Sequence, residues 1–253
     1  MSAAVDGLLV RVDSPVHRLP AHAKLVALVA FVALVVLLPP RQWWALLAAG
    51  SVIALVVRAA RLPGRTVLRR MVVETPFVVF ALLLPLLATG PRVEVLGVPL
   101  AADGLVGAWN LLAKATIGVV AAIVLAATTT PRDLVAGLER LRLPPALVQI
   151  VAFMLRYLSV VVDDLHRMRI ARESRGAPPG WRGQLRAVAS GVGALFVRTY
   201  ERGERVHQAM LARGWSGGST LLAGSPATAR EWATVATLPL AAALLAVLAR
   251  TLP

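Results

Sequence analysis

The sequence predicts an all-α, multi-pass membrane protein with about five transmembrane helices and a set of cytoplasmic amphipathic helices. Hydrophobic residues make up 58% of the 253 residues, more than a soluble domain of this size usually contains. They gather in long runs typical of membrane helices. The basic residues, which give a formal net charge of +14, lie mainly in the gaps between these runs. Membrane proteins mark their cytoplasmic face in this way, so nucleic-acid binding is the poorer explanation of the charge.

Four apolar runs lie in an N-terminal transmembrane region, residues 1–130, and the last run follows a Gly- and Ser-rich linker in residues 218–253. The runs cover approximately 25–38, 43–57, 71–89, 105–127 and 232–248. The loops at 39–42 and 90–104 are poor in basic residues, whereas the N-terminal segment, the loop after the second run and residues 131–217 are rich in them. The positive-inside rule therefore places the N-terminus and residues 131–217 in the cytoplasm, with the chain in the cell membrane.

Residues 131–217 are expected to form two long coupling helices, roughly Pro144–Gly176 and Gly183–Gly214, joined by a sharp turn at 176–180. Each carries an apolar stripe with helical periodicity and ends in a small residue, an arginine and a glycine. The two endings are Ser174-Arg175-Gly176 and Ala212-Arg213-Gly214. Arginine near a helix C-terminus and glycine as its left-handed cap explain one such ending without any function. Two of them favour docking, because a guanidinium on a rigid helix end suits an acidic groove.

Three charged residues interrupt apolar sequence: Glu74 and Lys114 in the third and fourth runs, and Arg156 in the first long helix. A charge exposed to lipid is costly, so each is expected to face protein or water. One interpretation is snorkelling, or ion pairs of Lys114 with Glu74 and of Arg156 with Asp163. The other is a polar contact with a membrane-embedded partner.

The sequence offers little for catalysis, so the chain is expected not to be an enzyme and to need no cofactor. The absence of cysteine excludes disulfides, thiolate metal ligands and a cysteine nucleophile. Lys24 and Lys114 lack the glycine-rich context of a phosphate-binding loop, so ATP hydrolysis would have to come from a partner. No metal site is expected, because the histidines have no ligand-type spacing; they are His17, His22, His166 and His207.

Several short motifs spread over nearly the whole chain resemble one family. They are Ser14-Pro15-Val16-His17-Arg18-Leu19 with Lys24-Leu25, Thr129-Thr130-Pro131-Arg132-Asp133-Leu134, Leu141-Arg142-Leu143-Pro144, Leu155-Arg156-Tyr157, Glu201-Arg202-Gly203-Glu204-Arg205-Val206 and Ala209-Met210-Leu211-Ala212-Arg213-Gly214. On these residues the sequence resembles the transmembrane T component of energy-coupling factor (ECF) importers, the CbiQ/EcfT family.

The resemblance implies a scaffold without catalytic activity. It would link a membrane-embedded substrate-capturing S subunit to two cytoplasmic ATP-binding subunits, with the arginine of each Ala-Arg-Gly motif in a groove of one ATPase. Residues 212–214 match that motif outright, whereas residues 174–176 keep the arginine and glycine but begin with serine. The segment 93–104 and the Thr-Pro-Arg-Asp stretch look most like the cobalt/nickel branch.

Three alternatives stay open at this point. The chain could be a T component that serves a vitamin-type S subunit. An independent secondary transporter would be expected to show inverted repeats with broken helices, and the sequence has no internal repeat. A membrane-embedded enzyme would need a clustered acid/base set, which the apolar runs lack.

Overall fold

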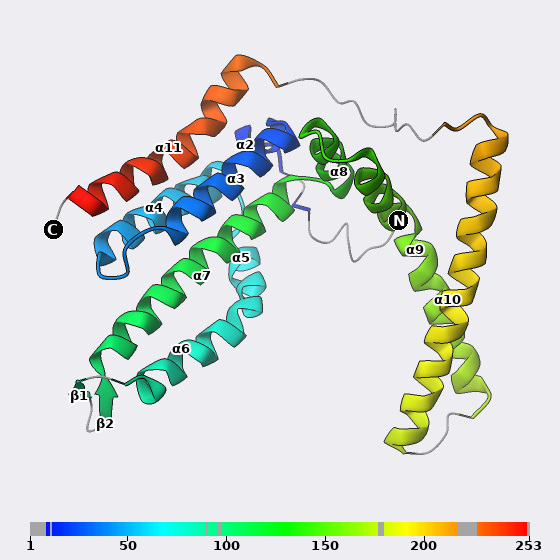
Figure 1. Cartoon of the computed structure of the whole chain (residues 1–253), viewed down its shortest axis with the longest axis horizontal. Helices are drawn as coiled ribbons and strands as arrows, with labels where there is room; N and C mark the ends of the chain where they lie inside the picture. The colour runs from blue at the N-terminus through cyan, green and yellow to red at the C-terminus, as the bar shows by residue number, and fades with distance from the viewer. Residues whose placement is uncertain are drawn as a thin grey trace. The chain divides into compact units, whose positions relative to one another are not determined.

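The structure, a computed structural model, describes residues 9–10, 12–89, 91–95, 98–176, 180–216 and 227–251. It is almost entirely helical and divides into two compact units (Figure 1). The membrane unit comprises Asp6–Gly137 and Gly224–Pro253, and the hairpin unit comprises Leu138–Ala223 together with Met1–Val5. The predicted turn residues 177–179 and most of the predicted linker, 217–226, lie outside the described residues.

Every predicted apolar run of the membrane unit forms a helix, and the predicted all-α, multi-pass architecture is confirmed. In chain order the elements are α2 (Pro15–Arg18), α3 (Ala21–Val36), α4 (Trp43–Ala59), α5 (Gly64–Arg70), the 3₁₀-helix η1 (Met71–Glu74), α6 (Thr75–Leu87), α7 (Ala102–Thr128), α8 (Pro131–Arg140) and α11 (Ala229–Thr251). Thr130 and Asp133 begin α8 with reciprocal hydrogen bonds of the capping-box type, with a proline at the first helical position. The pair Thr228 and Glu231 begins α11 in the same way.

The core of the membrane unit lies among α3, α4, α7 and α11, which pack side by side (Figure 1). Phe31, Val35 and Leu46 are its largest fully buried side chains. Around them the buried positions are largely alanines, which let helices approach closely where no hydrophobic driving force acts between them in lipid. These alanines are Ala45, Ala49, Ala121, Ala242, Ala246 and Ala249.

Within the described part of the chain, four helices are long and apolar enough to cross a membrane. They are Gly64–Leu87, Ala102–Thr128, Ala229–Thr251 and, in the hairpin unit, Pro145–Ser174. The helices α3 and α4, with 16 and 17 residues, are shorter than the roughly 20 residues that a full span needs. Part of α9 (Pro145–Ser174) is thus as apolar as a membrane span, although the sequence predicts a coupling helix there.

The stretch Gly64–Leu87 bends where η1 separates α5 from α6 (Figure 1). Pro76 is the second residue of α6, just after this 3₁₀ turn, and Pro85 lies inside α6. Proline cannot donate the backbone hydrogen bond of a helix interior. The second proline is buried against α7, where a Cβ on Gly104 would lie 2.7 Å from the Cα of Pro85. This glycine allows the closest approach between α6 and α7.

The segment 90–104, expected as a loop, contains a two-stranded antiparallel hairpin, β1 (Arg92–Val95) with β2 (Val98–Ala101). Arg92 pairs with Ala101, and Val95 pairs with Val98. The valines of both strands favour extended backbone, and a two-stranded hairpin tolerates Pro99 because each strand is an edge. This hairpin is the one departure from helix among the described elements.

The hairpin unit consists of α9 and α10 (Trp181–Ala212), which run in opposite directions (Figure 1). The predicted apolar stripes are present, and within the described part of the chain they stay largely exposed. Val148 is the one buried residue of α9, and α10 has none. Exposed apolar residues include Leu147, Ile150, Met154, Leu158, Val162, Leu185, Val192 and Phe196. A surface of this composition fits lipid or a partner better than water.

Candidate functional site: two arginine-glycine helix ends

The two predicted docking motifs have nearly the same backbone geometry. Arg175 caps α9 with φ −89° and ψ 8°, and Arg213 caps α10 with φ −94° and ψ 11°. The next residues, Gly176 and Gly214, have φ of +81° and +80°. Side chains with a Cβ rarely adopt this left-handed conformation, so each motif requires glycine after its arginine.

Hydrogen bonds fix both ends. The amide of Gly214 donates to the carbonyl of Leu211 at 2.9 Å, and that of Trp215 donates to Met210 at 3.0 Å, which together make a Schellman cap. At the first end, the amide of Gly176 donates to Glu173 at 3.3 Å in the equivalent position. The capping interpretation of the arginine-glycine pairs is thus right for the backbone, and it leaves both side chains free for another task.

Both guanidinium groups are exposed. Within the described residues, neither Arg175 nor Arg213 forms a side-chain hydrogen bond or an ion pair. By contrast, nearby Arg169 forms an ion pair with Glu173 at 2.8 Å. The arginines of the two helix ends therefore keep their full hydrogen-bonding capacity for an acidic partner.

The antiparallel pairing places these two arginines at opposite ends of the hairpin. Arg202 of α10 donates to Asp164 of α9 at 3.2 Å, which fixes the alignment of the helices in their middle. At about 1.5 Å per residue, the 30 residues of α9 separate the two helix ends by about 45 Å. The sequence predicted neighbouring helices, but it did not reveal that their C-terminal ends point away from each other.

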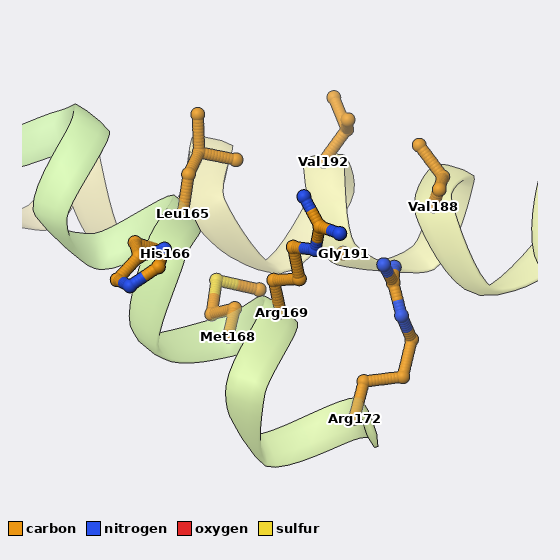
Figure 2. A pocket seen from close by; sticks show the side chains of 8 residues that line it. All are labelled: Leu165, His166, Met168, Arg169, Arg172, Val188, Gly191 and Val192. Carbon is orange, nitrogen blue, oxygen red and sulfur yellow. The ribbon is translucent and has the colours of Figure 1, made fainter. Parts of the chain in front are cut away.

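A hollow of about 330 Å³ lies between the helices near the Arg175 end (Figure 2). Leu165 from α9 and Val188 and Val192 from α10 give it apolar walls, and Arg169 and Arg172 extend across it toward α10. Gly191 of α10 also lines it, and a Cβ there would make only an ordinary van der Waals contact, at 3.7 Å, with the Met168 methyl of α9.

A second hollow of about 280 Å³ lies near the Arg213 end. Phe153 and Tyr157 of α9, whose rings stack at 6.3 Å, face His207 and Met210 of α10. Trp215 closes it and contacts His207 edge-on at 5.8 Å, so the residue that completes the cap also packs onto the hairpin. Neither hollow was predicted from the sequence, although the aromatic residues at helical spacing on α9 were an available signal for the second.

The structure excludes the ion pairs that were one interpretation of the charged residues in the apolar segments. Lys114 does not pair with Glu74; its ammonium group donates to the carbonyls of Val36 and Leu38, at 2.8 and 2.9 Å. These carbonyls end α3 and lack partners within the helix, so a lysine with three donors satisfies them. Glu74 is buried and accepts a hydrogen bond from the hydroxyl of Thr116.

Arg156 does not pair with Asp163 either. Its side chain is exposed on α9 and has no hydrogen bond or ion pair within the described residues. The carboxylate that forms an ion pair in this part of α9 is the next one, Asp164, because it faces α10 and meets Arg202. Arg156 therefore remains open to solvent or to a partner.

A polar cluster that the sequence analysis left without a role ties the N-terminal segment to α7. His17 Nε2 donates to the carbonyl of Val10, so in the neutral ring Nδ1 accepts the hydroxyl proton of Ser14 at 2.7 Å. Buried Lys24 donates to the carbonyl of Thr128 at 2.9 Å. At the exposed edge, a hydrogen bond from Arg18 lowers the pKa of Asp13.

Comparison with known proteins gives this geometry a context. The model of the CbiQ family, described as cobalt transport protein, matches residues 13–222. The chain belongs to this family. A cobalt transport protein CbiQ of Rhodobacter capsulatus is 30% identical over 208 residues, which cover 82% of this chain and 83% of the relative. The energy-coupling factor transporter transmembrane protein EcfT of Heliobacterium modesticaldum is 31% identical, covering 84% of each chain. EcfT of Bacillus subtilis is 28% identical, covering 86% and 87%.

These relatives confirm the resemblance inferred from the motifs, and they identify the chain as a membrane component of a transporter. The family match includes both arginine-glycine helix ends, which lie within residues 13–222. Among the residues predicted as a site, 174–176 and 212–214 share one helix-end backbone geometry. They belong to the hairpin unit, whereas Glu74 and Lys114 belong to the membrane unit.

Proposed function

We propose that this chain is the T subunit of an ATP-driven ECF-type importer, a scaffold that couples ATP hydrolysis in two partner ATPases to uptake by a membrane-embedded S subunit. Residues 1–130 and 218–253 would form the membrane part, and residues 131–217 the coupling helices. The N-terminus and the coupling helices would lie in the cytoplasm of a cell whose membrane holds the chain. The dense positive charge on these segments supports this orientation.

The observation that carries the proposal is the pair of matching helix ends with free guanidinium groups. The docking residues would be Ser174, Arg175 and Gly176 for one ATPase and Ala212, Arg213 and Gly214 for the other. Two ends about 45 Å apart on rigid helices suit two separate subunits better than one shared groove. Serine at the first motif leaves the cap unchanged, because its backbone conformation depends on the glycine.

The exposed apolar faces of α9 and α10 support an S subunit as the second partner. Ile150, Met154 and Phe196 are 55%, 66% and 69% exposed, and a membrane-embedded protein would cover them. Arg156, exposed among these residues, would supply a polar contact to that subunit. The cargo we propose is cobalt or nickel, since the family and one relative are described as cobalt transport proteins. A vitamin-type S subunit is the alternative, and uptake of radiolabelled cobalt by the complete complex distinguishes the two.

The test is co-purification of the two ATP-binding subunits with an Arg175→Glu/Arg213→Glu variant. We expect the variant to insert into the membrane at the normal level and to lose both ATPases. The matched control is Arg167→Glu/Arg198→Glu, which makes the same charge change at one exposed arginine of each helix, further from the helix ends. Normal co-purification of the first variant, or equal loss in both, contradicts docking through the helix ends.

A further inference from the structure

A cluster of arginines lies where α4 ends and α5 begins. It comprises Arg58, Arg61, Arg65, Arg69 and Arg70. The sequence contains no aspartate or glutamate between Asp13 and Glu74, so no acidic residue lies among these arginines. Neither the arginine-glycine helix ends nor the proposed docking of ATPases involves this cluster.

Three members of the cluster keep free side chains. Arg61 donates to the carbonyl of Asp13 at 3.4 Å, and Arg70 also has a partner. Arg58, Arg65 and Arg69 are exposed and form no hydrogen bond or ion pair within the described residues. Each guanidinium offers five N–H donors in a planar fork, which matches the geometry of a phosphate group.

The residues next to these arginines are exposed and apolar. Leu68, Val72 and Val73 are 71%, 69% and 73% exposed. Along the bent helix the arginines end at Arg70, and the exposed large side chains that follow, up to Phe80, are hydrophobic. A helix that passes from the headgroup layer into hydrocarbon shows this change from basic to apolar residues along its axis.

We propose that Arg58, Arg65 and Arg69 form a binding site for the phosphate groups of anionic phospholipids. The guanidinium groups hold the headgroup, and the acyl chains lie against Leu68, Val72 and Val73. The apolar residues favour a lipid over an acidic protein surface, because an acidic protein partner would leave these side chains in water. The chain would thereby enrich anionic lipids around α5, as clusters of basic residues beside a membrane helix do.

The experiment measures which lipid lies next to position 68. Because the chain has no cysteine, a Leu68→Cys variant can carry a single fluorophore. The labelled full-length chain is placed in proteoliposomes with brominated phosphatidylglycerol or brominated phosphatidylcholine, and the bromine of a lipid next to the label quenches the fluorescence of the label. A Leu86→Cys variant is the control, since Leu86 is also exposed, at 56%, but lies near the other end of α6.

At position 68 we expect phosphatidylglycerol to be preferred by about fivefold or more, the effect of one or more arginines near an anionic surface. At position 86 we expect no preference. Adding Arg58→Gln, Arg65→Gln and Arg69→Gln to the Leu68→Cys chain should remove the preference. If that variant fails to insert, the unaltered arginines still provide a test, because the preference must fall as salt is raised from about 0.05 to about 0.5 M.

Equal quenching by the two lipids at positions 68 and 86 overturns the proposal, as does a preference that salt leaves unchanged. Loss of the lipid contact when the ATP-binding subunits are added would assign the cluster to a protein interface instead. No step of the lipid measurement requires ATPases, so it can fail while the proposed docking function stands, and the reverse also holds.

Discussion

At the scale of single residues, Ser14 has more contacts than its place in a one-turn helix suggests. It is 3% exposed, and its hydroxyl accepts a hydrogen bond from the amide of His17 at 3.3 Å and forms a second one with the His17 ring. That ring holds the carbonyl of Val10, whose amide in turn donates to Ala127 at the end of α7. The Ser14 hydroxyl is therefore part of a chain of hydrogen bonds that links the N-terminal segment to the end of α7.

We predict that Ser14→Ala destabilises the protein by about 1–2 kcal/mol, the usual cost of removing a helix N-cap that has a second buried partner. The measurement is thermal unfolding in detergent, followed by circular dichroism. The control is Ser190→Ala, because Ser190 is exposed on α10 and bonds only the nearby carbonyl of Ala187. Equal unfolding temperatures of the two variants would mean that the cluster contributes nothing to stability.

Asp164 and Arg202 provide a measurable polar link within the hairpin unit. Their side chains are 17% and 38% exposed and lie 3.2 Å apart on different helices. We predict a coupling free energy of about 0.5–1 kcal/mol in a double-mutant cycle with Asp164→Asn and Arg202→Gln, because the pair is partly shielded from water. The control cycle uses Glu201 and Arg205, a pair at 3.9 Å on the same helix with exposed side chains. A coupling no larger than in this control would show that the link contributes nothing to the hairpin.

At the scale of elements, the close packing of α6 against α7 depends on a glycine, Gly104, which has no side chain. A Cβ on Gly104 would lie 2.7 Å from the Cα of Pro85 and 2.9 Å from the carbonyl oxygen of Leu84. Both are backbone atoms and cannot rotate away, so the helices would have to separate. By contrast, a Cβ on Gly107, one turn further along α7, meets nothing within 4 Å.

We therefore predict opposite effects of the same substitution at these glycines. Gly104→Ala should destabilise by about 1–3 kcal/mol through overpacking. Gly107→Ala should be neutral or stabilise by up to about 1 kcal/mol, since alanine is the better helix former. Thermal unfolding of both variants in the same detergent measures the difference. If Gly104→Ala unfolds at the temperature of Gly107→Ala, α6 and α7 do not pack as closely as described.

Comparison of these elements shows what the sequence could and could not predict. Hydropathy located the apolar helices of the membrane unit, because a lipid environment demands long apolar runs. It did not indicate α2, or α5, which lies in a segment expected to be a loop. It could not predict which residues of different helices contact each other. Lys114, for example, donates hydrogen bonds to the carbonyls of Val36 and Leu38, which lie 78 and 76 positions earlier in the chain. The hairpin at 92–101 was missed because its valines stand between prolines and glycines that suggest a loop.

At the scale of the whole molecule, the residues proposed for docking were predictable as a motif but not as an arrangement. The ends of α9 and α10 can be predicted from the sequence, because a glycine just after an arginine is typical of a helix C-terminus. Their separation depends on antiparallel pairing, which is fixed by distant contacts such as Arg202 with Asp164. This arrangement turns two copies of a short motif into a bivalent attachment, if the two ATPases bind as a pair.

Bivalent attachment makes a quantitative prediction for single variants. A linked second contact raises affinity by about 100-fold or more over one contact alone, so Arg175→Glu and Arg213→Glu should each weaken binding of the ATPase pair by at least that factor. Titration of the ATPase pair onto the chain in lipid nanodiscs measures this, with Arg198→Glu as the control for added negative charge at an exposed site in the middle of α10. Because the two helix ends share one geometry, the single variants should be weakened to a similar extent. A loss confined to one of them would mean that only that arginine bears the attachment, and the symmetry of the helix ends would then be a property of their caps alone.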